Sequence, residues 1–180
     1  MFRNLVLVGL PCCGKTTLGK IVAERCSMKF IDVDEIACER SVVREPNSTA
    51  WISMSRMPYH QDEIVQSLKN ETEPTVVSTG ADDVVDWRNA QALRDFGTVV
   101  YIKQDRKLLL EKAKIRFPFV EYPDGKEGEP RDVSEFIFSR FEANAYLYDA
   151  IANTYIENNG TIEEGVEKLL KIVKTLEGNF

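Results

Sequence analysis

The sequence has little that would bind nucleic acid, cross a membrane or build a disulfide framework. Acidic residues outnumber basic ones by 29 to 23, which excludes a broad basic surface for nucleic acid. No apolar run approaches the roughly 20 residues that a membrane-spanning helix needs. The four cysteines, at 12, 13, 26 and 38, lack the paired spacing of a zinc site and indicate reduced thiols. We expect a cytoplasmic monomer without nucleic-acid or membrane partners.

Short β-branched runs alternate with helical patterns along the chain. The alternation predicts an α/β fold, with a parallel sheet flanked by helices in a single domain over residues 1–180. The expected strands are LVLV at 5–8, FIDV at 30–33, TVVST at 75–79, TVVYI at 98–102 and TYI at 154–156.

Helical periodicity fills the segments between these runs. Helices are expected to start near Lys15 and to cover Leu108–Ala113 and Val133–Ala152. The last helix begins with a capping box of Thr161 and Glu164. Its expected inward residues are Ile162, Val166, Leu169, Leu170 and Val173.

Two segments break this alternation. Residues 41–60 mix prolines, Trp51 and Met54 without a clean period, and we expect an inserted helical patch over a pocket. Residues 117–131 hold three prolines and two glycines. A loop of that length inside a compact domain is either a mobile lid or a disordered segment.

The stretch VGLPCCGKTTLGK, residues 8–20, directly follows the first expected strand. Gly9, Gly14, Lys15 and Thr16 fit the spacing G-x-x-x-x-G-K-[ST] between a strand and an amphipathic helix. Glycines let the backbone wrap around phosphate oxygens, Lys15 neutralises charge and Thr16 can ligate Mg²⁺. The alternative is an ordinary glycine turn before a helix.

The loop is predicted to hold the phosphates of a nucleoside triphosphate. Cys12 and Cys13 occupy its variable positions, where small residues fill the loop. The predicted nucleotide-binding residues within it are Gly9, Cys12, Cys13, Gly14, Lys15, Thr16 and Thr17.

Asp32 and Asp34 close the second expected strand, in the run FIDVD. Because side chains alternate along a strand, both carboxylates are expected on one side, at the sheet edge where parallel sheets gather ligands. One acid could hold a magnesium water and the other could meet an acceptor hydroxyl. The alternative is an aspartate that caps the helix expected to start at Glu35.

These residues resemble the shikimate kinase family of small nucleoside-monophosphate-kinase-like enzymes. The resemblance runs over nearly the whole chain and is carried by VLVGLPCCGKTTLGK, FIDVDEI and VVSTGADDVVDWRNAQALRDFGTVVYIKQDRKLLLEKAK. It implies a five-stranded parallel sheet in the order 2-3-1-4-5 and phosphate transfer from ATP to a ring hydroxyl of a small carboxylic acid. It also implies an acceptor-binding helical patch at about 35–70 and a closing lid at about 116–131.

The resemblance also implies roles for individual residues. Asp34 would orient the acceptor hydroxyl, and Thr16 and Asp32 would hold Mg²⁺. Lys15 and Arg116, the latter at the position of a lid arginine, would serve catalysis and contact the nucleotide. The implied acceptor-binding positions are Asp34, His60, Gly80, Ala81, Asp82 and Asn144. Arg140 is predicted to bind the acceptor as a replacement arginine.

The acceptor pocket departs from the family pattern at three places. His60 and Asn144 stand where the family has arginines, and Gly80-Ala81-Asp82 stands where it has three glycines. Each arginine contact with a carboxylate contributes roughly 1.5–3 kcal/mol. Either another arginine replaces the lost contacts, with Arg56, Arg88 and Arg140 available, or the acceptor is different.

Three functions are therefore open on the sequence. The first is a shikimate kinase that forms shikimate 3-phosphate, and the second is a kinase of the same fold for another hydroxylated metabolite. The third is a nucleotide-binding module that has lost the reaction.

Overall fold

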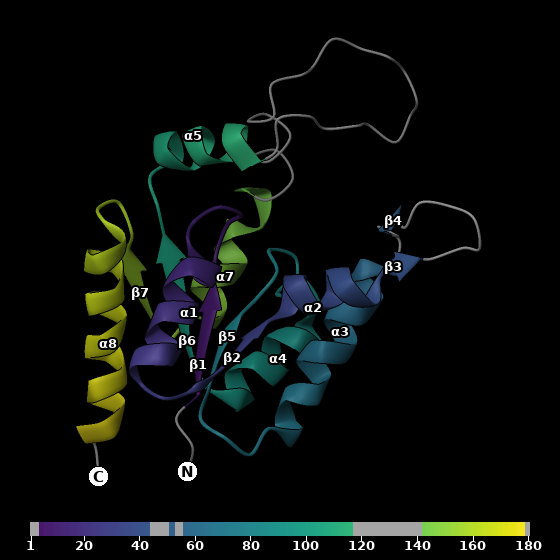
Figure 1. Cartoon of the computed structure of the whole chain (residues 1–180), viewed down its shortest axis with the longest axis horizontal. Helices are drawn as coiled ribbons and strands as arrows, with labels where there is room; N and C mark the ends of the chain where they lie inside the picture. The colour runs from purple at the N-terminus through teal and green to yellow at the C-terminus, as the bar shows by residue number, and fades with distance from the viewer. Residues whose placement is uncertain (1–3, 44–50, 53–55, 117–141, 179–180) are drawn as a thin grey trace.

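The computed structural model describes residues 4–43, 51–52, 56–116 and 142–178. Its centre is a five-stranded parallel sheet in the order β2-β5-β1-β6-β7 (Figure 1). Counted along the chain, these strands follow the expected order 2-3-1-4-5, and each begins and ends within one residue of its predicted run. They are β1 (Leu5–Val8), β2 (Lys29–Asp32), β5 (Thr75–Ser78), β6 (Thr98–Lys103) and β7 (Thr154–Glu157).

Helices cover both faces of this sheet (Figure 1). The first and last helices, α1 and α8, pack together on one face, whereas α2, α3, α4 and α7 contribute to the core of the other face. The helices are α1 (Lys15–Arg25), α2 (Val33–Arg40), α3 (Met57–Ser67), α4 (Trp87–Phe96), α5 (Arg106–Arg116), α7 (Ala145–Ile151) and α8 (Ile162–Gly178), with 3₁₀ turns η1 (Leu68–Asn70) and η2 (Glu142–Asn144).

The central strand β1 shows why the sequence specifies this arrangement. Successive side chains of a strand point to opposite faces, so a strand covered on both faces must be apolar throughout. Leu5 and Leu7 are fully buried in the core beneath α1 and α8, and Val6 and Val8 are fully buried in the opposite core. The run LVLV therefore joins the two cores.

The expected helical patch over residues 41–60 is partly wrong. Val42–Val43 and Trp51–Ile52 form a short antiparallel pair, β3 and β4. The β-branched and aromatic side chains of these residues favour extended backbone over helix. Helix α3 begins only at Met57, with Pro58 in its first turn, where the missing N–H is not needed.

Two expectations near the carboxyl terminus are corrected as well. The described part of Val133–Ala152 is not one α-helix, because the 3₁₀ turn η2 precedes a short α7. The capping box is confirmed, since the Thr161 N–H donates to Glu164 Oε2 at 2.8 Å and the Glu164 N–H donates to Thr161 Oγ1 at 3.2 Å. Ile162, however, is 55% exposed, because it lies in the first turn at the open end of α8.

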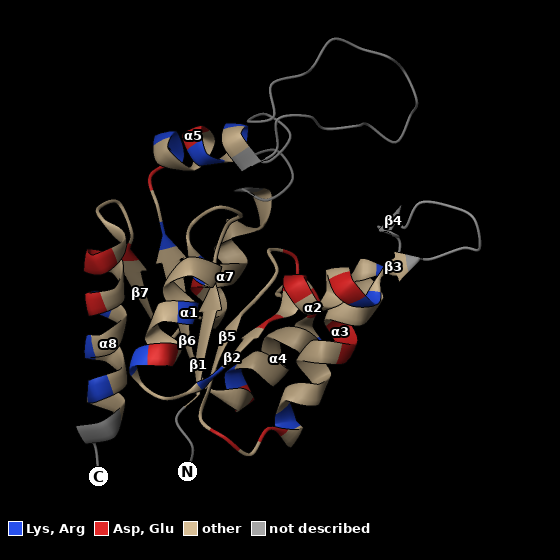
Figure 2. Ribbon diagram, viewed as in Figure 1, with Lys and Arg blue, Asp and Glu red and all other residues tan. Residues whose placement is uncertain are grey.

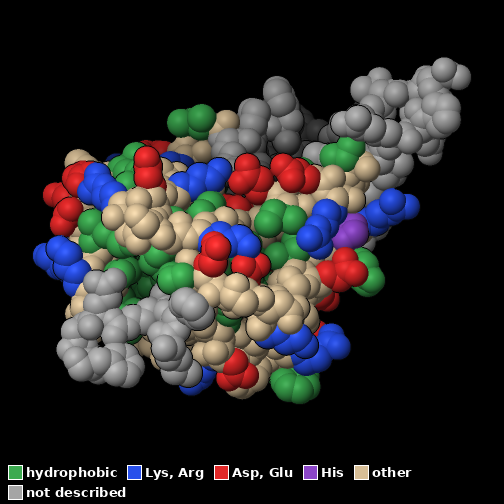
Figure 3. All heavy atoms as spheres, turned by 60° about the horizontal axis from the view of Figure 1, so that its bottom comes forward, with side chains coloured by type: hydrophobic (Ala, Val, Ile, Leu, Met, Phe, Trp, Pro, Cys, Tyr) green, Lys and Arg blue, Asp and Glu red, His purple; other side chains and the backbone are tan. Residues whose placement is uncertain are grey.

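Charge and hydropathy at the surface are mixed. On the face shown in Figure 3, acidic and basic side chains of the described residues are interspersed with apolar ones. None of the helices that the structure describes combines the length and the apolar character needed to cross a membrane.

Candidate active site

The loop between β1 and α1 has the tight backbone that its glycines predict. Gly9 and Gly14 adopt φ values of 146° and 104°, which L side chains rarely tolerate. A Cβ at Gly9 would lie 2.8 Å from the Ile102 carbonyl oxygen, and one at Gly14 would lie 2.7 Å from Asn158 Nδ2. Both positions therefore require glycine, and the loop closes onto the N-terminus of α1.

Lys15 lies over this loop at the start of α1. Its ammonium group donates to the carbonyl oxygens of Gly9 at 2.8 Å and Leu10 at 3.1 Å, and the residue is only 8% exposed. The cavity beside it has a volume of about 140 Å³ and is lined by Pro11, Cys12, Gly14, Lys15, Thr16, Thr17, Asp34 and Thr79. A buried ammonium group and a helix N-terminus together favour a bound anion.

Local positive charge is also present nearby, although the whole chain is acidic. Helix α5 lies at the carboxyl end of the sheet, and its sequence RKLLLEKAKIR is predominantly basic (Figure 2). Arg116 is its last residue, and the side chain of Arg116 lies outside the described part of the chain. The predicted lid at 117–131 and Arg140 also fall outside it.

Asn158, which the sequence analysis missed, holds the loop from the far end of the chain. Its side-chain amide donates to the Cys13 carbonyl oxygen at 2.8 Å, and the residue is 6% exposed. Asn158 directly follows β7 and so lies at the carboxyl end of the sheet, where the phosphate loop also lies. No local motif marks this asparagine, since its role depends on the sheet order.

Thr16 and Asp32, the two predicted Mg²⁺ ligands, lie in contact with each other. The Thr16 hydroxyl donates to Asp32 Oδ2 at 2.6 Å and lies 3.4 Å from Ser78 Oγ. Asp32 Oδ1 accepts from the Glu35 N–H at 3.1 Å, so the same carboxylate also caps α2. Hydroxyl and carboxylate oxygens suit Mg²⁺, which keeps several waters and needs few protein ligands.

The predicted placement of Asp34 on a strand is wrong. Strand β2 ends at Asp32, and Asp34 lies in the first turn of α2. The helix start nevertheless brings Asp34 to the same cavity as Lys15 and Thr16. Gln61 of α3, to which the sequence assigned no role, donates from Nε2 to Asp34 Oδ1 at 2.7 Å and fixes that carboxylate.

The Gly80–Asp82 loop after β5 adjoins Asp34. A Cβ at Gly80 would clash with Asp34 Oδ1 and would lie 2.7 Å from Gln61 Nε2. The Tyr148 hydroxyl of α7 donates to the Ala81 carbonyl oxygen at 2.7 Å, and this tyrosine is fully buried. Glycine at position 80 thus permits the close approach of Asp34, and Tyr148 holds the loop.

Asp83, at the end of this loop, is a buried acid. Its Oδ2 accepts from the Gly80 N–H at 2.7 Å, whereas Oδ1 has no hydrogen-bond partner among the described residues. Burial, and then the negative charge of Asp34, raise the pKa of Asp83 to about 7, against the opposing effects of the Gly80 N–H and Lys15.

His60 and Asn144 were both predicted to bind the acceptor. His60 Nδ1 lies 3.1 Å from Glu63 Oε2 on the same helix, and this contact lowers the pKa of Glu63. Asn144 precedes α7 without capping it through its side chain. Among the described residues, the lining of the phosphate cavity includes neither of them.

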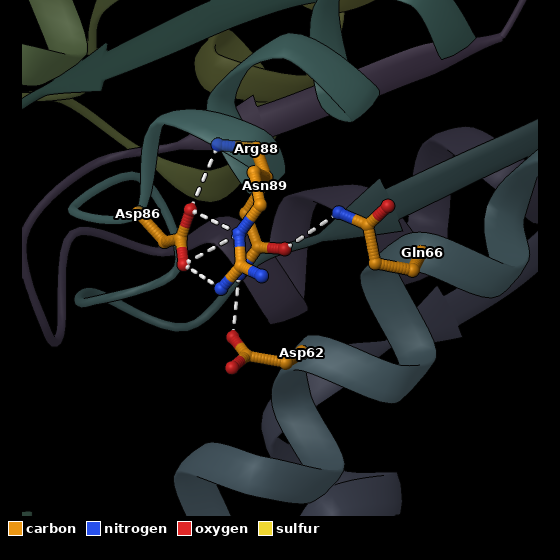
Figure 4. Close-up of polar contacts among 5 residues, drawn as sticks. All are labelled: Asp62, Gln66, Asp86, Arg88 and Asn89. Carbon is orange, nitrogen blue, oxygen red and sulfur yellow. Dashed lines mark hydrogen bonds and ion pairs between the residues drawn. The ribbon is translucent and has the colours of Figure 1, made fainter.

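Arg88 is already paired, which weighs against its use as a replacement arginine. Figure 4 shows its guanidinium against Asp86, with Nη2 to Oδ2 at 2.5 Å and Nε to Oδ1 at 3.1 Å. This contact lowers the pKa of Asp86 to about 2. The neighbouring Asn89 links α4 to α3 by donating to Asp62 at 2.6 Å and accepting from Gln66 at 2.9 Å.

Comparison with known proteins agrees with this geometry. The family model described as shikimate kinase matches residues 11–174. The chain belongs to the shikimate kinase family. It is 25% identical to the shikimate kinase of Azobacteroides pseudotrichonymphae over 93% of this chain and 98% of that protein. It is 27% identical to the shikimate kinase of Legionella pneumophila over 86% of this chain and 93% of that protein. Membership indicates an ATP-dependent small-molecule kinase of the P-loop class.

Solved structures share the fold. Shikimate kinase from Bacteroides thetaiotaomicron superposes with a TM-score of 0.72 at 20% identity, over 96% of this chain and 98% of that one. The enzyme from Acinetobacter baumannii, solved in complex with shikimate, gives a TM-score of 0.72 at 22% identity, over 97% and 94%. At these identities the superpositions support the fold of the shikimate kinase family.

Substitution of Asn158 tests how the loop is held. Asn158→Ala leaves the Cys13 carbonyl without its donor, and we expect about tenfold weaker nucleotide binding, because a lost hydrogen bond costs roughly 1–1.5 kcal/mol. Calorimetric titration with ADP measures this. Asn159→Ala is the matched control, since its side chain accepts from the Asp105 N–H instead. Equal affinities of both variants and the unsubstituted protein would contradict the assignment.

The pKa of Asp83 predicts how stability depends on pH. With an ordinary value of 3.8 in the unfolded chain and about 7 in the folded one, the folded state binds this proton more tightly. The stabilising contribution of this proton is complete below the unfolded value and is lost as pH rises through about 7. Asp83→Asn should therefore raise the melting temperature more at pH 8 than at pH 5.

Thermal unfolding at both pH values measures this difference. The exposed Asp95 provides the control, and Asp95→Asn should change the melting temperature equally at both pH values. If Asp83→Asn changed the melting temperature equally at pH 5 and pH 8, Asp83 would be ionised at both pH values, contrary to this prediction.

Proposed function

We propose that the chain transfers the γ-phosphate of ATP to a hydroxyl group of a small metabolite, with Mg²⁺ as cofactor and shikimate as the acceptor. One observation carries this proposal. Asp34 lines the same cavity of about 140 Å³ as Lys15 and Thr16, so an acceptor hydroxyl at Asp34 is beside the phosphate loop. The family match supports shikimate as the first acceptor to test.

The residues have the following roles in the proposed reaction. The N–H groups of the Gly9–Thr17 loop and the N-terminus of α1 bind the phosphates, and Lys15 exchanges two carbonyl oxygens for phosphate oxygens. Thr16 and Asp32 would hold Mg²⁺, which supplies positive charge against the developing charge on phosphate. Asp34 orients the acceptor hydroxyl and accepts its proton. Arg116 would add positive charge from the end of α5.

The described acceptor side favours a second possibility, an acceptor without a carboxylate. Arg88 is paired with Asp86, His60 lies against Glu63, and an aspartate occupies position 82. A carboxylate beside Asp34 and Asp82 would meet like charge. A neutral polyol of similar size avoids this repulsion.

An assay of acceptors separates these possibilities. Coupled ADP release with Mg²⁺ and ATP should give the highest kcat/KM on shikimate if the proposal is right. Quinate, gluconate and neutral cyclitols serve as the comparison set. A neutral cyclitol preferred over shikimate by more than about tenfold, or 1.4 kcal/mol, would move the assignment to the second possibility. ATP binding without turnover on any hydroxyl would overturn both.

Substitution of Asp34 tests the assigned role in transfer. Asp34→Asn keeps the shape and the contact with Gln61 but cannot accept a proton, so kcat should fall by roughly 10²–10⁴-fold. The Kd for ATP should stay within about twofold, because Asp34 borders the acceptor side. The exposed Glu39→Gln, on the same helix, is the matched control. Unchanged turnover of Asp34→Asn would refute the role.

A further inference from the structure

Among the residues that the structure describes, Asp83 is the one buried acid beside the site to which the proposed reaction gives no role. The residue is 3% exposed, and its Oδ2 accepts the Gly80 N–H three residues earlier at 2.7 Å. This contact closes the Gly80–Asp82 loop on its inner side, while Tyr148 binds the Ala81 carbonyl oxygen from α7. The loop beside Asp34 is therefore held by a carboxyl group and a phenol.

The missing side chain of Gly80 shows how near the two acids are. A Cβ placed there would clash with Asp34 Oδ1 and would lie 3.0 Å from Asp83 Oδ1. Both oxygens thus border the same small space, one from the first turn of α2 and one from the loop after β5. Asp83 Oδ1 has no hydrogen-bond partner among the described residues.

The groups that face Asp83 come from four elements. Asp34 of α2 and Asp62 of α3 add negative charge, Lys15 of α1 adds positive charge, and Tyr148 of α7 is neutral. A like charge close to a buried carboxyl group disfavours ionisation of that group, which here is Asp83. Since Oδ2 accepts the Gly80 N–H, the proton of neutral Asp83 belongs on Oδ1, facing the space shared with Asp34.

We propose that Asp83 is a positioning residue for phosphoryl transfer, whose neutral carboxyl group holds the Gly80–Asp82 loop beside Asp34 and whose ionised form slows transfer. The inference depends on the proposed function, because it concerns the acceptor side of the same site. When Asp83 is neutral, Asp34 is the only charged carboxylate among the described residues that borders the space at Gly80. Ionisation adds a second negative charge there, which repels the transferring phosphate.

The test compares pH profiles of the full chain. In Asp83→Asn the amide oxygen still accepts the Gly80 N–H, and the amide N–H takes the place of the carboxyl O–H. The unsubstituted enzyme should lose about tenfold in kcat as Asp83 ionises around pH 7, whereas Asp83→Asn should lose none. The KM for ATP should stay within about twofold in both. Asp95→Asn, at an exposed site, should keep the full profile.

Three outcomes would overturn the inference. One is an unaltered pH profile in Asp83→Asn, and another is a drop in kcat by the same factor at every pH, which indicates a purely structural role. The third comes from the unsubstituted protein with ¹³C-labelled aspartate, if no carboxyl signal titrates near pH 7 together with the Gly80 amide. This measurement needs neither a folded variant nor turnover. If activity is absent on every acceptor, the proposed function fails, while the Gly80 signal still decides whether Asp83 holds the loop as a neutral acid.

Discussion

The hydrogen bond from Thr16 to Asp32, at 2.6 Å, connects the parts of this site. It links the first turn of α1, which carries the phosphate loop, to the end of β2. The second oxygen of Asp32 caps α2 at 3.1 Å, and this cap fixes where that helix begins. Asp34 is then two residues along, in the first turn, and reaches the cavity beside Lys15. One buried carboxylate thus sets both the proposed metal position and the acceptor position.

The charge balance of the site explains why an acidic protein can bind a polyanion there. Lys15 and the N-terminus of α1 supply positive charge at the loop, but Asp32, Asp34 and Asp83 surround it. Two compensations follow from elementary electrostatics. A divalent cation beside Asp32 would offset the charge of the phosphates, and a proton on Asp83 removes the least solvated negative charge. The raised pKa of Asp83 is therefore a property of the whole site, set by burial and by the charges of neighbouring residues.

Much of the fold could be predicted from the sequence, because β-branched runs in a doubly covered sheet leave a clear apolar pattern. The phosphate loop could be predicted because it depends on local backbone geometry at Gly9 and Gly14. The prediction that Asp34 lies on a strand was wrong. Two acidic residues separated by one residue fit the end of a strand and the first turn of a capped helix equally well. The parts played by Gln61, Asp83 and Asn158 were missed, since each arises from contacts between distant segments.

The acceptor loop shows why family resemblance alone leaves the acceptor undecided. In this chain the Gly80 N–H donates to Asp83, and the Ala81 carbonyl accepts from Tyr148. Both backbone groups are thereby bonded to the protein itself. Selectivity then has to come from side chains around Asp34, and the described ones offer carboxylates and the Gln61 amide in preference to guanidinium groups. A substrate carboxylate would need Arg116, Arg140 or another cation to come to this side, whereas a hydroxyl group needs only Asp34.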